Sequence, residues 1–132
     1  MSESPPPTAP HGELVIRTIA MPADTNASGD IFGGWLMSQM DLGAAIYAQN
    51  LARSRVTTVA VDGMAFLHPV NVGDIVNCHA SLLKTGRTSM QIAVEAWVQR
   101  GRDGGLLRVT KGIFTYVAID DHGRPQPVQR PA

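Results

Sequence analysis

The sequence has little of what would mark it for an unusual environment or partner. It contains a single cysteine, so it has no internal disulfide. Eleven basic and eleven acidic residues give a formal net charge of zero, which excludes the basic surface of a dedicated nucleic-acid binder. No apolar run approaches the roughly 18 residues that span a bilayer, and the N-terminus lacks a positive stretch followed by a hydrophobic block. We therefore expect a cytoplasmic protein without membrane insertion and without a nucleic-acid partner.

Motifs of several enzyme classes are absent as well. The four histidines lie far apart and show no metal-ligand spacing with cysteine or carboxylates, so we expect no metal. The chain has neither the Gly-x-Ser-x-Gly turn of α/β-type serine hydrolases nor a dinucleotide fingerprint, and no cofactor is expected. Cys78 stands in an alternating segment and is interpreted as a small apolar strand residue rather than a nucleophile.

Length and composition fit one globular domain. The chain has 132 residues, of which 44% are hydrophobic and 17% charged, close to the averages of folded domains. Residues 1–11 and 121–132 hold seven of the nine prolines and cannot bury enough apolar surface to fold. We predict a flexible proline-rich tail at each end and one domain over residues 12–120.

The order of patterns along this domain is one strand, one helix and four strands. Branched residues predict a strand over 13–20, and turn residues over 21–30 predict a loop. Asp30 stands at the N-cap position of a helix predicted over 31–52. The extended segments that follow are separated by turn residues and favour an antiparallel meander; they cover 56–67, 74–85, 89–100 and 106–119.

The predicted helix is apolar or small on nearly every face, as Gly43, Ala44, Ala45 and Ala48 illustrate. Such a helix has to be surrounded by protein. An α+β domain whose antiparallel five-stranded sheet wraps around one long central helix would cover one side of it. The other side should meet a second subunit, most simply in a two-fold dimer.

Asp41 is the most informative residue because it interrupts this apolar helix with a charge. Burying an ionised carboxylate without partners is very costly, so a chain keeps one that is paired, protonated or lining a solvent-filled cleft. All three states occur at active sites. From the helix composition alone, a carboxylate that faces a water pocket or caps a backbone group is an equally good interpretation.

Two further features precede Asp41. Gly33 and Gly34 leave backbone N–H groups accessible at the positive end of the helix, where a carbonyl oxygen that gains negative charge would be stabilised. Taken alone, paired glycines favour close packing of the helix start against a strand. Asn26 lies in a loop that can also form Asx-turns without any catalytic purpose.

Several motifs occur together and in order: MPADTN (21–26), GDIFGGW (29–35) and MSQMD (37–41). They closely resemble the signature of the hot-dog acyl-CoA thioesterases of the bacterial YciA type. The resemblance continues through VAVDGMAFLHPV (59–70), VGD (72–74) and TGRTS (85–89). It implies a single hot-dog domain that hydrolyses acyl-CoA to free fatty acid and CoA. The ligands it implies are the acyl-CoA substrate and the CoA product. Because family members commonly form trimers of dimers, it also implies further copies of the chain as partners.

The resemblance also implies roles for the candidate catalytic residues. Asp41 matches the helix carboxylate that acts on the thioester, either as general base or as nucleophile. Asn26 matches the loop asparagine that assists it and would come from a different subunit. Gly34, with Gly33, would donate backbone hydrogen bonds to the oxyanion.

Residues 84–89 offer contacts for the phosphates of CoA. The loop supplies cations and hydroxyl groups from Lys84, Arg87, Thr88 and Ser89. Taken by itself, such a segment is more often a solvated hairpin turn. Alternative phosphate contacts are Arg53, Arg55 and Lys111, which no motif supports.

Two other functions fit the same fold. One is a non-catalytic acyl-CoA or CoA-binding sensor, and the other is an acyl-thioester dehydratase, which would need a histidine beside the carboxylate. His68 is the candidate for that histidine, but its position before Pro69 at a strand end favours a structural role.

Overall fold

The structure, a computed structural model, describes residues 7–128. Its elements are the strand β1 (Glu13–Ile19), the short 3-10 helix η1 (Pro22–Asp24), the helix α1 (Gly33–Ala52), and the strands β2 (Arg55–Phe66), β3 (Ile75–Thr85), β4 (Ser89–Gln99) and β5 (Leu106–Ile119). The predicted α+β class, the five strands and the single long helix are confirmed. Each strand begins and ends within about one residue of its predicted bounds.

The strands form one antiparallel sheet in the order β1-β3-β4-β5-β2. β3, β4 and β5 are a meander, but β2 pairs with β5 at the far edge instead of with β3. The predicted four-strand meander is therefore wrong for β2. α1 carries the chain across the sheet, so that β2 begins at Arg55 opposite Ile119, the end of β5.

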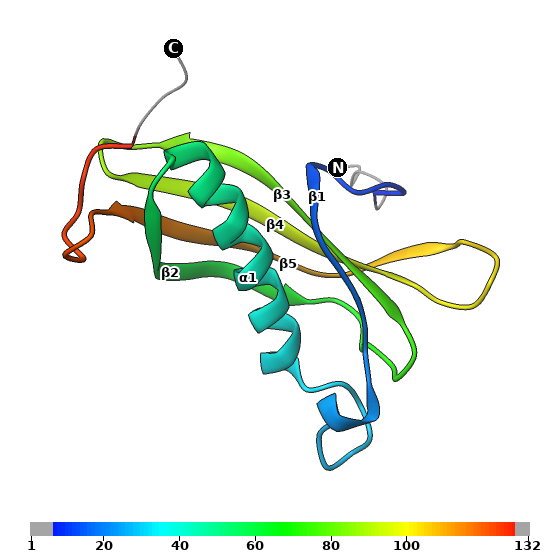
Figure 1. Cartoon of the computed structure of the whole chain (residues 1–132). Helices are drawn as coiled ribbons and strands as arrows, with labels where there is room; N and C mark the ends of the chain where they lie inside the picture. The colour runs from blue at the N-terminus through cyan, green and yellow to red at the C-terminus, as the bar shows by residue number, and fades with distance from the viewer. Residues whose placement is uncertain (1–6, 129–132) are drawn as a thin grey trace.

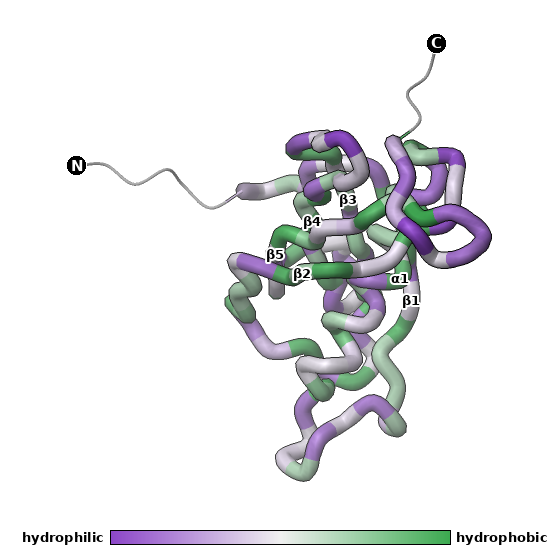
Figure 2. Tube along the Cα trace, turned by 90° about the vertical axis from the view of Figure 1, so that its left-hand side faces the viewer, coloured by the Kyte–Doolittle hydropathy of each residue, from purple (hydrophilic) through white to green (hydrophobic). Residues whose placement is uncertain are grey.

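α1 lies across one face of this sheet, between the edge strands β1 and β2 (Figure 1), which is the hot-dog arrangement. Alternate residues of β4 and β5 turn toward the helix and are buried, and several of the loops are hydrophilic (Figure 2). Small helix residues allow a close approach: a Cβ on Gly43 would lie 2.6 Å from Val15 Cγ2. The residues that join the helix to the core are Leu36, Met40, Ala44, Ala48 and Ala52.

The start of α1 differs from the prediction. The helix begins at Gly33 and its N-cap is Phe32, so the assignment of Asp30 as N-cap and of a helix from residue 31 is wrong. The N–H of Ile31 donates to the carbonyl of Val70 at 3.1 Å. This bond to the segment after β2 keeps residue 31 outside the helix.

One face of α1 is left uncovered by its own chain. Leu42 is 56% exposed and Ile46 is 51% exposed, and residues four apart lie on the same helix face. This exposed strip is the part of the helix for which the sequence predicts a second subunit. Although α1 is 20 residues long, no helix among residues 7–128 combines the length and apolarity needed to cross a membrane.

The predicted N-terminal tail is described from residue 7 onward; residues 1–6 lie outside the described part of the chain. The N–H of His11 donates to Glu95 Oε1 at 3.0 Å, and Trp97 and Arg108 donate to the same carboxylate. Burial acts to raise the pKa of Glu95, but the hydrogen bonds from His11, Trp97 and Arg108 outweigh it and hold the pKa below its usual value.

At the other end, residues 129–132 lie outside the described residues, and residues 121–128 follow the end of β5. The N–H of Gln126 donates to the carbonyl of Ala118, and the N–H of Val128 donates to the carbonyl of Arg87, each at 2.9 Å. Val128 also packs against the core. The contacts of the folded unit thus continue beyond residue 120, where the sequence places the end of the domain. The flexibility of the two tails stays a prediction.

Candidate active site

Asp41 lies on α1 and turns its side chain toward β2 and β5. It is half-buried, and its Oδ1 accepts hydrogen bonds from Thr58 Oγ1 at 2.8 Å and from the Tyr116 hydroxyl at 2.7 Å. Thr58 and Tyr116 face each other in the register of β2 and β5. Asp41 forms no salt bridge within residues 7–128; the two hydroxyl groups stabilise its carboxylate by hydrogen bonds instead.

The Tyr116 hydroxyl lies beneath this carboxylate. The side chain is fully buried, and its ring stacks on Phe114 with centroids 6.5 Å apart. Burial raises the pKa of Tyr116 above its usual value, and the hydrogen bond and negative charge of Asp41 raise it further. The phenol therefore stays protonated and donates to Asp41 across the physiological pH range.

The two glycines are the first residues of α1. Their N–H groups have no acceptor within the helix, because the first turn has no preceding carbonyls to bond. A Cβ on Gly34 would meet the ring of Phe32 at 2.5 Å, and a Cβ on Gly33 would lie 3.5 Å from the ring of Phe66. A pocket of about 210 Å³ opens beside this helix start, and the residues that line it are Ile31, Gly33, Leu36, Phe66, Leu67, His68, Pro69 and Val70.

Asn26 is exposed and occupies the loop before α1 (Figure 1). Its Oδ1 accepts the N–H groups of Ser28 at 2.9 Å and Asp30 at 3.2 Å, which is the Asx-turn that the sequence allows. Within one chain, Asn26 and Asp41 are not brought together. The loop lies beyond the helix start, and Asp41 is eight residues inside the helix, about 12 Å along its axis.

The hairpin between β3 and β4 contains the residues predicted to bind phosphate. Lys84 is near the end of β3, Arg87 and Thr88 form the turn, and Ser89 begins β4. The Thr88 carbonyl accepts the N–H of Ala118 at 2.9 Å, which fixes the turn to β5.

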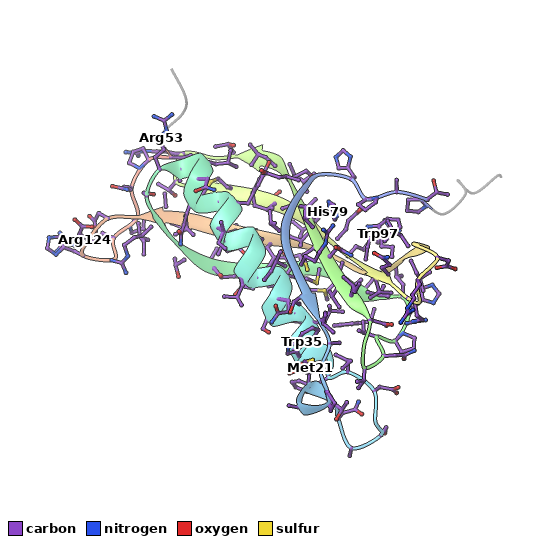
Figure 3. The ribbon with its side chains drawn as sticks, turned by 45° about the vertical axis from the view of Figure 1, so that its right-hand side comes forward. Met21, Trp35, Arg53, His79, Trp97 and Arg124 are labelled. Carbon is purple, nitrogen blue, oxygen red and sulfur yellow. The ribbon has the colours of Figure 1, made fainter. Side chains whose placement is uncertain are left out.

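This hairpin lies at the end of the sheet where α1 ends (Figure 1). Arg53, which ends the helix with a left-handed φ of 52°, lies at the same end of the molecule as Arg124 (Figure 3), whereas Trp35 and Met21 lie near the helix start (Figure 3). A helix of 20 residues is about 30 Å long. Within one chain, the hairpin and the Gly33–Gly34 pair are therefore at opposite ends of α1.

The other titratable candidates lie away from Asp41. His68 lines the pocket just beyond the end of β2, where Phe66 pairs with Thr110 of β5. Thr110 is six strand residues, or about 20 Å, from Tyr116, so His68 lies far from the Asp41 carboxylate that Tyr116 binds. Burial raises the pKa of Cys78 to about 12, so its thiol is neutral near pH 7. Among residues 7–128, no three or more His, Cys, Asp or Glu side chains gather where a metal ion could bind.

Sequence reasoning missed Thr58 and Tyr116, the two residues that contact Asp41. Both lie on strands with no charge or motif to distinguish them from neighbouring strand residues. What identifies them is the pairing of β2 with β5. Alternation along a strand shows which residues share a face but not which strand is its neighbour.

An antiparallel sheet around one central helix, with a hydrogen-bonded carboxylate on that helix, defines a hot-dog domain with a candidate catalytic centre. The family model of the thioesterase superfamily matches residues 28–104. The chain belongs to this superfamily.

Individual relatives agree with this assignment. The chain is 56% identical over 122 residues to the acyl-CoA thioester hydrolase YciA of Salmonella typhimurium strain LT2, covering 90% of this chain and 92% of the relative. The hexameric thioesterase y2039 of Yersinia pestis has a similar structure, with a TM-score of 0.89, 58% identity and coverage of 93% of this chain and 100% of that chain. A mutant of HI0827, a hexameric broad-specificity acyl-coenzyme A thioesterase, has a TM-score of 0.88 and 50% identity, covering 91% and 88% of the two chains.

Proposed function

We propose that this protein is an enzyme that hydrolyses acyl-CoA thioesters to a free carboxylic acid and CoA. The observation that carries the proposal is the half-buried Asp41 carboxylate, held on the central helix by Thr58 and Tyr116. The 56% identity with a protein described as an acyl-CoA thioester hydrolase supports the choice of substrate. We also propose that the enzyme works in the cytoplasm, a reducing compartment that suits a chain with one unpaired cysteine.

Asp41 acts on the thioester in one of two ways. As general base, it takes a proton from water while the water oxygen bonds to the carbonyl carbon; the C–S bond then breaks, its electron pair stays on sulfur, and the proton returns to the CoA thiolate. As nucleophile, the carboxylate bonds to the carbonyl carbon and displaces the thiolate, and water cleaves the resulting anhydride. Each route consumes one water and releases one carboxylic acid and one CoA.

The N–H groups of Gly33 and Gly34 of the partner subunit stabilise the oxyanion that forms on either route, because the helix start of the same chain lies about 12 Å along the axis from Asp41. The positive end of the α1 dipole adds to this effect, and the neighbouring pocket gives the substrate access to the helix start. Asn26 orients the water or the carboxylate. Because its Oδ1 accepts two backbone N–H groups of its own loop, its amide NH₂ is the end that would make these contacts.

The active site is shared between copies of the chain. In a two-fold dimer with antiparallel helices, the exposed strip with Leu42 and Ile46 would become buried. Such a dimer would also place the hairpin of one chain at the helix start of its partner, so that Lys84, Arg87, Thr88 and Ser89 could bind the phosphates of the CoA whose thioester reaches Asp41. We propose a trimer of such dimers, which agrees with the hexameric state of y2039 and HI0827.

Release of CoA from short, medium and long acyl-CoAs, followed with a thiol reagent, tests the activity. The variant Asp41→Asn should lose about a hundredfold or more in kcat, the range expected for an acid–base residue. Asp62→Asn is the matched control, since Asp62 is an exposed carboxylate on β2 and should leave kcat unchanged. An intact protein that releases no CoA from any chain length, or an Asp41→Asn variant with full activity, would overturn the proposal. Calorimetry that detects CoA binding without turnover would then favour a sensor.

Co-expression of two inactive variants tests whether the site is shared. Suppose that Asp41 and Asn26 of different chains form one site. Equal amounts of Asp41→Asn and Asn26→Ala chains that pair at random across a two-fold axis then give about half mixed dimers, each with one intact site of two. About a quarter of all sites should therefore be active. If both residues of one chain serve the same site, the mixture stays inactive. Light scattering on the same samples gives the number of chains per particle.

A further inference from the structure

We propose that Tyr116 is a positioning residue that holds Asp41 by one oxygen, Oδ1, so that the other oxygen, Oδ2, is the atom that reacts. This inference rests on the proposed function and specifies which atom performs the chemistry. The carboxylate that carries the function has two oxygens, and the structure surrounds them differently.

Both hydroxyl donors bind the same oxygen. Thr58 Oγ1 and the Tyr116 hydroxyl lie 2.8 Å and 2.7 Å from Asp41 Oδ1, whereas no hydrogen bond from residues 7–128 reaches Oδ2. An oxygen that accepts two O–H groups has its lone pairs engaged and is the weaker base and nucleophile. Oδ2 keeps its lone pairs for a water molecule or for the carbonyl carbon.

The two donors also prevent the oxygens from exchanging places. A free carboxylate is symmetric, and rotation about its Cβ–Cγ bond makes either oxygen available. Here such a rotation would break both hydrogen bonds to Oδ1, and hydrogen bonds to an ionised group are the strong ones. Asp41 therefore presents one defined oxygen in one defined direction, which is what a reaction needing close alignment requires.

Tyr116 acts through Asp41 and not on the substrate. Its side chain is fully buried under the helix, so the hydroxyl has no route to a bound thioester. The hydroxyl also lies 3.1 Å from the Asp41 carbonyl, but it has a single hydrogen. The shorter distance and the negative charge assign that hydrogen to Oδ1.

The variant Tyr116→Phe tests this role, with Tyr47→Phe as the matched control. Tyr47 is half-buried on the same helix as Asp41, and its hydroxyl makes no hydrogen bond to any of the described residues. We expect Tyr116→Phe to lower kcat by about tenfold to a hundredfold, the worth of a hydrogen bond to a charged group. KM should stay within about twofold, because the hydroxyl does not touch the substrate. Tyr47→Phe should match the wild type.

The pH profile separates positioning from a purely structural role. Loss of a donor that binds the carboxylate in its ionised form should move the acid limb of kcat/KM to higher pH than in the wild type. A Tyr116→Phe protein whose acid limb coincides with that of the wild type overturns the inference, whatever its stability. A failure of all variants and of the wild type to release CoA would refute the proposed function instead.

Thr58 provides a second measurement if Tyr116→Phe does not fold. Thr58 is exposed, so Thr58→Val removes the other donor without disturbing the core, and Thr58→Ser retains the hydroxyl. If Oδ1 is the held oxygen, Thr58→Val should move the acid limb in the same direction and Thr58→Ser should restore it. An unchanged acid limb in Thr58→Val also overturns the inference.

Discussion

Replacement of Arg100 should destabilise the protein more than replacement of Asp74, the residue it binds. Asp74 is 3% exposed, and its carboxylate accepts hydrogen bonds from Arg100 Nε at 3.0 Å and from Arg100 Nη2 at 2.9 Å. The Arg100 side chain is 44% exposed. Arg100→Met therefore leaves a buried anion without its cation, whereas Asp74→Asn leaves a cation that water can solvate.

The size of this asymmetry follows from the remaining contacts. Removal of one partner from a fully buried ion pair costs about 3–5 kcal/mol. Because Arg100 is partly exposed and Asp74 keeps the N–H of Asn71 at 2.8 Å, we expect about 2–3 kcal/mol for Arg100→Met and about 1 kcal/mol for Asp74→Asn. One kcal/mol corresponds to roughly 3–5 °C in a domain of this size, so the thermal unfolding midpoint (Tm) of Arg100→Met should lie about 6–15 °C below that of the wild type.

Urea unfolding of both single variants and of the double variant measures the free energies of unfolding, and thermal unfolding measures the midpoint temperatures. The double variant should be more stable than Arg100→Met, since it no longer buries a lone charge. Arg100 Nη2 also donates to the carbonyl of Pro69 at 3.0 Å. Because Pro69 lines the pocket at the start of α1, Arg100→Met should raise KM. An Asp74→Asn variant that is as unstable as Arg100→Met, or less stable, would refute the reasoning.

Three further predictions concern other parts of the fold. Gly43→Ala should lower stability by about 1–3 kcal/mol in thermal unfolding despite the better helix propensity of alanine, because the new Cβ would overlap Val15; an unchanged Tm would show that β1 can move away. Cys78→Ala should keep full CoA release, and Cys78 should resist iodoacetamide at pH 8 in mass spectrometry, since burial raises the pKa of its thiol to about 12. Glu95→Gln should lose stability relative to the wild type above pH 4.5, and this difference should vanish as pH falls through the lowered pKa of Glu95; a difference that persists in acid urea titrations would contradict that assignment.

The sequence predicts the fold where local patterns determine it. The five strands and the end of α1 at Ala52 follow from alternation and apolar periodicity, and the charge of Asp41 stands out against the helix around it. The position of β2 does not follow, because its pattern would suit either edge of the sheet. Asp30 resembles an N-cap by residue type, but the hydrogen bond from the Ile31 N–H to the Val70 carbonyl keeps residue 31 outside the helix, which begins at Gly33.

The same limit applies to the candidate site. Asp41 is found from its unusual surroundings, whereas Thr58 and Tyr116 are ordinary strand residues until β2 and β5 are paired. The assignment of Asn26 and of the hairpin around Arg87 comes from motifs. Within one chain, Asn26 lies away from Asp41 and the hairpin lies at the opposite end of α1 from Gly33 and Gly34, so the geometry of a single subunit does not by itself assemble the site that the motifs predict.

The order in which the chain is synthesised gives the link between Asp41 and Tyr116 a further consequence. Tyr116 lies 75 residues after Asp41, on the last strand of the sheet, and contacts between such distant segments form late in folding. A nascent chain still lacking β5 would carry Asp41 without the phenol that holds it. Ribosome-bound or truncated chains that lack β5 should therefore be unable to hydrolyse thioesters. The chain would become active only when β5 has joined the sheet.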